Sequence, residues 1–169
     1  IKNHYFSTLN LINALGEINI ERYVHTGSSD EYGNLKSPQI ETLRESPQTP
    51  YSASKVAISH TLEAISQSDS FPATILKLFI VYGPYQGRGR LIPDVIRALL
   101  AGEEISVSSG QQKRDFCYVA DIVNALKLSA IKKKAIGKSI NIGSGRSIPV
   151  IDIVKKIEAK VGTGKVIYG

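Results

Sequence analysis

Apolar and polar positions along the chain predict helices and strands in alternation. Helices are expected, from apolar residues spaced three or four apart, over residues 5–15, 50–65, 93–100, 122–131 and 149–161. Strands are expected over residues 22–26, 73–81, 104–107, 116–119, 139–142 and 165–168. The apolar segment 73–81 is typical of a strand buried on both faces of a parallel sheet. The alternation therefore predicts an α/β fold with a mainly parallel sheet.

Turn and capping residues place the ends of several elements. Gly16 is expected to cap the end of the first helix, and Pro50 suits the first turn of the second. Gly27 is expected to break the first strand, and Asp121 to cap the start of the fourth helix. Residues 32–50, punctuated by glycine and proline, are expected to form a loop.

The composition is that of an ordinary globular domain. The chain has 169 residues, of which 42% are hydrophobic and 21% charged, enough for one core. It contains no apolar run of about 18 residues and no basic-then-apolar leader, so neither a membrane span nor secretion is expected. The single cysteine, Cys117, fits a reducing compartment, and we expect a cytoplasmic protein. Because the chain starts at Ile1 and lacks methionine, we expect it to be a segment of a longer protein.

The net charge of +6 is spread along the chain, with one short run at Lys132–Lys134. No aromatic-and-basic motif accompanies the charge, so nucleic acid is not favoured as a partner. An anionic small ligand such as a nucleotide diphosphate explains a basic surface equally well. The three histidines share no metal-ligand spacing with each other or with Cys117, so no metal site is expected.

Tyr51 and Lys55 lie four residues apart in the expected second helix, so their side chains share a face. A lysine ammonium close to a phenol favours the phenolate, which can act as a general base. Taken alone, the spacing favours an ordinary exposed helix pair.

Four further motifs accompany this pair. They are HTGSSDEYG (25–33), LKLFIVYGP (76–84), QQKRDFCYVADI (111–122) and NIGSG (141–145). In this order and spacing, the five segments resemble the extended short-chain dehydrogenase/reductase family, and more narrowly the NAD-dependent epimerase/dehydratase enzymes that act on nucleotide sugars. The resemblance extends over nearly the whole chain, and five motifs in order are far more specific than one.

The resemblance implies a Rossmann-like, mainly parallel sheet, here without its first βαβ units, and a smaller substrate-binding lobe. Residues 1–82 would be the C-terminal part of the NAD(P)-binding Rossmann domain. Residues 83–169 would be mainly the substrate-binding lobe, with 139–161 returning to the Rossmann sheet. The family's G-x-x-G-x-x-G loop is absent from these residues, so we expect this segment to bind its cofactor, NAD or alternatively NADP, poorly. A homodimer through the helices 5–15 and 50–65 is also implied, although their apolar residues could equally face the sheet.

The resemblance assigns roles to individual residues. Tyr51 corresponds to the catalytic tyrosine, and Lys55 to the lysine that favours its phenolate and holds the nicotinamide ribose. Ser28 matches the Ser/Thr that hydrogen-bonds the reacting sugar oxygen, and Tyr82 borders nicotinamide and sugar. Removing a hydride from a carbinol carbon requires the hydroxyl proton to be taken at the same time, which suits a tyrosine base beside a serine donor.

Two positions after Ser28 bear on the type of reaction. Asp30 stands where the family's 4,6-dehydratases carry glutamate, and Ser29 where they carry Asp or Ser. Asp30 could supply the additional carboxyl group that elimination of water needs, but it is one methylene shorter. Asp30 and Glu31 could equally be solvated loop acids.

Substrate contacts are expected from the second half of the chain. Arg114 matches the arginine that the family places against the nucleotide diphosphate, with a surface ion pair to Asp115 as the alternative. Arg88 and Arg90, in a glycine-containing loop, could reach the same phosphates. Ile80 stands where many family members have a substrate-contacting asparagine, so the sugar must be oriented differently or contacted from elsewhere.

The sequence thus predicts an NAD(P)-dependent nucleotide-sugar epimerase/dehydratase acting by hydride transfer at sugar C4. Its catalytic set would be Ser28, Tyr51 and Lys55, and its partner a nucleotide-diphosphate sugar. A 4-keto-6-deoxy nucleotide-sugar reductase stays open, in which Tyr51 donates its proton to the substrate. A non-catalytic relative that binds nucleotide or RNA is the alternative of a different class, and the intact Ser–Tyr–Lys set argues against it.

Overall fold

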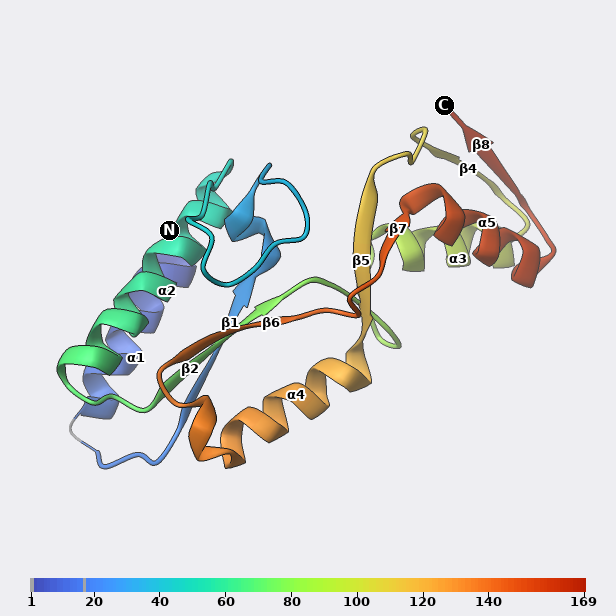
Figure 1. Cartoon of the computed structure of the whole chain (residues 1–169). Helices are drawn as coiled ribbons and strands as arrows, with labels where there is room; N and C mark the ends of the chain where they lie inside the picture. The colour runs from blue at the N-terminus through green and yellow to red at the C-terminus, as the bar shows by residue number, and fades with distance from the viewer. Residues whose placement is uncertain (1, 17) are drawn as a thin grey trace. The chain divides into compact units, whose positions relative to one another are not determined.

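The computed structural model describes residues 2–16 and 18–169, which form two compact units (Figure 1). The first unit comprises the chain up to Phe79 together with Ala120–Ile142. The second comprises Ile80–Val119 and Gly143–Gly169. Each unit has its own strands, helices and apolar core.

The first unit is built on a three-stranded parallel sheet in the order β1-β2-β6. Its strands are β1 (Tyr23–Ser28), β2 (Ala73–Leu78) and β6 (Lys138–Ile142). Ser28 is in register with Leu78, and Leu78 with Ile142, so the three strands end together. The loops that follow the strands therefore leave from one edge of the sheet.

Helices cover this sheet in the first unit. They are the π-helical turn η1 (Lys2–Phe6), α1 (Ser7–Gly16), the 3-10 turn η2 (Ser29–Tyr32), α2 (Pro50–Ser68), α4 (Val119–Ile131) and the 3-10 turn η3 (Lys133–Ala135). One apolar cluster joins α1, α2 and β2 through Ile12, Ile58, Leu62, Ala73 and Ile75. Burial of such side chains is the main stabilising contribution to this layer.

The second unit contains the remaining elements. They are β3 (Ile80–Tyr82), α3 (Leu91–Leu100), β4 (Glu104–Val107), β5 (Lys113–Tyr118), β7 (Ser147–Pro149), α5 (Val150–Val161) and β8 (Lys165–Tyr168). β5 pairs in parallel with β3 and antiparallel with β7, and β4 pairs in parallel with β8. The core between α3, α5 and β8 consists of Val95, Leu99, Val154 and Val166.

The structure confirms the α/β class and the mainly parallel pairing. The expected strand over residues 73–81 is wrong as a single element, because β2 ends before Phe79 and β3 pairs in another sheet. Ile80, at 37% exposure, is accordingly not buried on both faces. Gly27 lies inside β1 rather than ending it, and Asp121 lies in the first turn of α4 rather than capping it.

Residues 139–161 divide between the two units. β6 completes the sheet of the first unit, whereas α5 packs against α3 in the second. Among the helices of the described residues, none is both long and apolar enough to span a bilayer.

Candidate functional site

Ser28 lies where β1 passes into the turn η2. Its backbone is extended, with φ −145° and ψ 144°, and its Oγ accepts a hydrogen bond from the backbone N–H of Asp30 at 3.1 Å. The backbone N–H of Ser28 donates to Oε1 of Glu31 at 2.8 Å, which completes a capping box. Because Oγ is an acceptor in this turn, the hydroxyl proton of Ser28 remains available to donate to another oxygen.

Tyr51 and Lys55 lie on the first turns of α2. The helix begins with Thr49 as N-cap and Pro50 at its first position, as the sequence predicts for Pro50. Tyr51 is 42% exposed, and its ring lies edge-on to the ring of His4, with 5.2 Å between centroids. Lys55 is only 8% exposed, so the two side chains face different surroundings although they share one side of the helix.

Lys55 ties α2 to the carboxyl end of β1. Its Nζ donates to the carbonyl oxygen of Thr26 at 2.7 Å, two residues before Ser28. Burial lowers the pKa of the Lys55 ammonium, and the Glu31 carboxylate opposes this effect. The structure therefore brings Lys55 and the Ser28 turn to the same strand end.

His25 is a partly buried residue of β1, close to this strand end, that the sequence did not single out as a site residue. Burial, the positive charge of Lys55 and nearby His4 lower the pKa of His25 to about 4. Its imidazole is therefore neutral at neutral pH, and the buried Nε2 has no hydrogen-bond partner in the described part of the chain.

Ser29, Asp30 and Glu31 follow Ser28 in η2 but have different environments. Asp30 is exposed and Ser29 is partly buried, whereas Glu31 is 0% exposed. The expectation that Glu31 is a solvated loop acid is therefore wrong. Only Asp30 of these two acids has its carboxylate on the surface.

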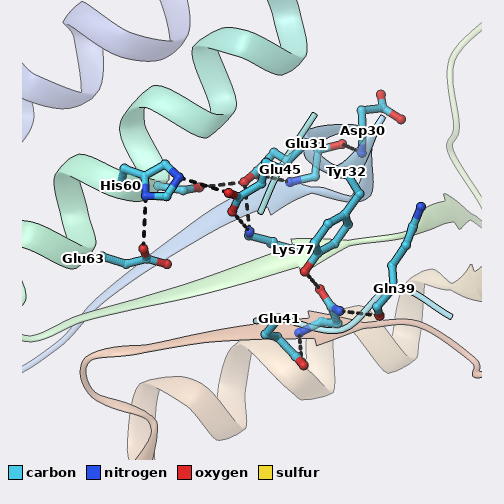
Figure 2. A network of polar contacts seen from close by, with 12 residues as sticks. Asp30, Glu31, Tyr32, Gln39, Glu41, Glu45, His60, Glu63 and Lys77 are labelled. Carbon is cyan, nitrogen blue, oxygen red and sulfur yellow. Dashed lines mark hydrogen bonds and ion pairs between the residues drawn. The ribbon is translucent and has the colours of Figure 1, made fainter. Parts of the chain in front are cut away.

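A buried polar network surrounds Glu31 (Figure 2). Lys77 of β2, itself 0% exposed, lies between two carboxylates, with Nζ 2.5 Å from Oε1 of Glu45 and 3.4 Å from Oε2 of Glu31. Burial alone would lower the pKa of Lys77, but the two carboxylates raise it above its ordinary value. Within residues 2–16 and 18–169, no three acidic, histidine or cysteine side chains are grouped as metal ligands.

Sequence reasoning missed this network, although one signal was available. Lys77 is the only charged residue in the apolar stretch ATILKLFIV, which was expected to be buried. A buried ammonium requires a carboxylate partner, so this lysine indicates that at least one acidic side chain is also buried next to the strand.

The other expected site residues lie in the second unit. Ile80 and Tyr82 belong to β3, where the ring of Tyr82 packs on that of Tyr118 with 5.6 Å between centroids. Arg88 lies exposed in the loop between β3 and α3. These placements concern the second unit alone.

Arg114 is exposed on β5, and the expected alternative of an ion pair with Asp115 is wrong. The Asp115 carboxylate instead accepts hydrogen bonds from both the N–H and the hydroxyl of Ser144 and from the N–H of Gly145, at 2.7–2.8 Å. Arg114 donates one Nη1 bond to the carbonyl of Lys113 at 2.9 Å. Its remaining donors are free to bind an anion.

Comparison with known proteins places these features in a family context. The model of the NAD dependent epimerase/dehydratase family matches residues 1–143. An uncharacterized UDP-glucose epimerase of Bacillus subtilis is 31% identical over 149 residues, which is 88% of this chain and 47% of that protein. A dTDP-glucose 4,6-dehydratase of Xanthomonas campestris is 33% identical over 139 residues, 80% of this chain and 39% of that protein.

A solved structure shares the fold as well. The UDP-glucuronic acid 4-epimerase of Bacillus cereus, in complex with UDP-glucuronic acid and NAD, has a TM-score of 0.91 and 27% sequence identity. The match covers 99% of this chain and 54% of the epimerase. The chain thus spans about half the length, or less, of the relatives that it matches.

Proposed function

The chain belongs to the NAD-dependent epimerase/dehydratase family, and on that premise we propose that it carries the catalytic set of a nucleotide-sugar enzyme acting at sugar C4. The observation that carries the proposal is the bond from Lys55 to Thr26, which joins the Tyr51–Lys55 helix to the strand that ends in Ser28. Two elements, α2 with Tyr51 and Lys55 and β1 with Ser28, thereby supply candidates for a base, its charged neighbour and a hydrogen-bond donor.

In the proposed reaction, Tyr51 is the general base for the C4 hydroxyl. Its exposed ring can reach a substrate, whereas the ammonium of Lys55 is buried and hydrogen-bonded to the carbonyl oxygen of Thr26 in β1. The positive charge of Lys55 stabilises the phenolate of Tyr51 when the substrate proton is removed. Ser28 donates its hydroxyl proton to the substrate oxygen and fixes that oxygen next to the base.

The residues of the chain fit a nicotinamide cofactor. An ammonium has three N–H donors, and the bond to Thr26 uses one of those on Lys55, which leaves donors for ribose hydroxyls. Lys55 would hold the ribose, and Tyr51 would border the nicotinamide. A bound cofactor, NAD or alternatively NADP, would supply the hydride acceptor and donor at C4.

The substrate is proposed to be a nucleotide-diphosphate sugar. Arg114 is exposed and not neutralised by Asp115, so its guanidinium can pair with phosphate oxygens. A relative with 27% identity is described in complex with UDP-glucuronic acid and NAD, which supports this class of ligand. Further candidates for substrate contacts are Ser29 in the first unit and, in the second unit, Arg88 and Ile80.

A 4,6-dehydratase is the second candidate reaction, because Asp30 presents an exposed carboxylate two residues after Ser28. Oxidation at C4 acidifies the C5 proton, and loss of water from C5 and C6 then needs an acid close to the sugar. Several relatives are named dTDP-glucose 4,6-dehydratase, which supports this version.

Product analysis by NMR separates the two versions. Full-length protein is incubated with UDP-, dTDP-, GDP- and CDP-hexoses in the presence of NAD or NADP. When the reaction is run in D₂O, an epimerase returns a sugar inverted at C4, whereas a dehydratase returns a 4-keto-6-deoxy sugar with solvent deuterium at C5. Asp30→Asn should abolish only the dehydratase product. Absence of any product with all four nucleotides and both cofactors would refute the proposed function.

A further inference from the structure

Glu31 is a fully buried acid that is hydrogen-bonded to Ser28, and the reaction proposed above assigns no role to it. Its Oε1 accepts the backbone N–H of Ser28 at 2.8 Å, and its Oε2 accepts the hydroxyl of Ser59 at 3.1 Å. Oε2 also lies 3.4 Å from Nζ of Lys77. Both oxygens of the carboxylate are therefore held by donors from three different elements.

Lys77 makes this buried carboxylate tolerable. Its ammonium is shared between Glu31 and Glu45 and lies 4.8 Å from the centroid of the Tyr32 ring (Figure 2). The hydroxyl of Tyr32 in turn donates to Oδ1 of Asn141 on β6 at 2.8 Å. The carboxylate of Glu31 thus belongs to a continuous polar network that spans the sheet, and it cannot rotate without breaking several buried contacts.

The space for the Glu31 carboxylate depends on a glycine in β1. A Cβ on Gly27 would lie 2.6 Å from Oε1 of Glu31 and 3.2 Å from Cγ of Lys77. The absence of a side chain at residue 27 therefore lets the carboxylate lie against the strand, beneath the N–H of Ser28. The site for this carboxylate is thus shaped by both the strand and the turn.

We propose that Glu31 is a positioning residue that fixes Ser28 for the reaction at C4, and this inference rests on the role proposed for Ser28. The carboxylate holds the backbone N–H of Ser28, while the serine Oγ is held by the N–H of Asp30. These two bonds determine where the serine hydroxyl lies and leave its proton free to donate. The two adjacent acids differ in environment, because Asp30 is exposed to solvent whereas Glu31 is buried and bonded to the turn.

Two substitutions of Glu31 distinguish the effect of its side-chain length from the effect of its negative charge. Glu31→Gln keeps the length of the side chain and an oxygen that accepts the Ser28 N–H, but it removes the charge, and Lys77 retains Glu45 as its partner. Glu31→Asp keeps the charge but is one methylene too short to reach the Ser28 N–H. If the carboxylate positions Ser28, Gln should preserve function and Asp should not.

The kinetic test uses the full-length protein. Glu31→Asp should lower kcat by about a hundredfold with KM changed less than about threefold, because a misplaced donor acts on the transition state. Glu31→Gln should retain kcat within about fivefold of wild type, since the amide oxygen still accepts the Ser28 N–H. Glu45→Gln also removes one carboxylate from Lys77, but Glu45 makes no hydrogen bond to Ser28 or Glu31 in the described residues, so this variant should leave kcat unchanged. The reverse order, with Asp active and Gln impaired, would show that charge balance around Lys77 matters and would overturn the proposal.

A second readout does not depend on turnover. Hydrogen exchange of the Ser28 amide, measured by NMR, should be at least about tenfold faster in Glu31→Asp than in wild type, with Glu31→Gln close to wild type. Equal protection in all three proteins would overturn the proposal even if the enzyme were active. If the wild-type protein converted no nucleotide sugar, the proposed function would fail, while the exchange data would still decide whether Glu31 holds Ser28.

Discussion

The ammonium of Lys55 lies 2.7 Å from the carbonyl oxygen of Thr26, so the beginning of α2 is bonded to the end of β1. This contact joins two segments that are 29 residues apart in the chain. It places the helix that carries Tyr51 beside the strand that carries Ser28. This relationship is the structural observation on which the proposed catalytic set of Ser28, Tyr51 and Lys55 rests.

Replacement of Lys77 by methionine should strongly destabilise the first unit. Lys77→Met leaves the carboxylates of Glu31 and Glu45 buried without their shared cation, which typically costs about 3–5 kcal/mol. Urea denaturation measures the change in the free energy of unfolding. The control Lys36→Met removes an exposed charge and should change it by less than about 0.5 kcal/mol. Equal stability of the two variants would contradict a structural role for the network.

Acid should remove a stabilising contribution of Glu45. Burial alone would raise its pKa, but the hydrogen bond and charge of Lys77 hold the pKa of Glu45 below its ordinary value of 4.5. The folded state therefore binds fewer protons than the unfolded state between that lowered pKa and 4.5. The stabilisation is fully present above this window and is lost as the pH falls through it.

This pH dependence can be measured by urea denaturation at several pH values from about 6 to about 3. Wild-type protein should lose more free energy of unfolding on acidification than Glu45→Gln, which has no carboxyl group to protonate at this position. Parallel losses in the two proteins would show that Glu45 does not contribute to acid lability.

The sequence predicted the general fold because the periods of its apolar positions are clear. The helix that begins at Pro50 and the strands at residues 104–107 and 165–168 were predicted correctly, since local propensity and burial agree there. The apolar stretch 73–81 was misinterpreted because periodicity shows that a segment is buried but not which partner strand it pairs with. The change from β2 to β3 at Phe79 depends on tertiary pairing with β6 and β5.

In the candidate site, too, the local sequence pattern indicates some features, whereas others depend on tertiary contacts. Tyr51, Lys55 and Ser28 could be proposed as site residues from motifs, because the proposed chemistry requires particular residue types. Glu31 could not be separated from Asp30 by sequence, since adjacent acids in a turn look alike until the direction of each side chain is known. Burial of one and exposure of the other follow from the capping box and from Lys77 on a strand 46 residues later.

An added methyl group at Gly27 should disturb the Glu31 carboxylate. Gly27→Ala would place a Cβ 2.6 Å from Oε1 of Glu31, so the carboxylate or the strand must shift, at a cost of about 1–3 kcal/mol. Gly16→Ala is the matched control, because its added Cβ would have no heavy atom within 4 Å among the described residues outside its chain neighbours and the backbone of its own helix. Thermal denaturation should show a lower Tm for Gly27→Ala only. A wild-type Tm in that variant would indicate that the carboxylate has room to move.

Loss of the Arg114 charge should weaken substrate binding without slowing the chemical step. Arg114→Gln should raise KM for the nucleotide sugar about 10–100-fold, which corresponds to one charge-assisted interaction with phosphate. Lys113→Gln removes the same charge from the neighbouring residue, whose side chain points to the opposite face of β5. In steady-state kinetics, a rise in KM for Arg114→Gln alone would identify Arg114 as the residue that binds the phosphates. A similar rise in KM for both variants would instead indicate a general effect of surface charge.

The most direct test of the account is the turnover number of Tyr51→Phe in the full-length protein. The variant keeps the ring against His4 and removes only the hydroxyl group that is proposed to take the C4 proton. We predict that kcat falls at least about a thousandfold, while Tyr23→Phe, at the amino end of β1, stays within about twofold of wild type. Full activity in Tyr51→Phe would contradict the proposed catalytic set.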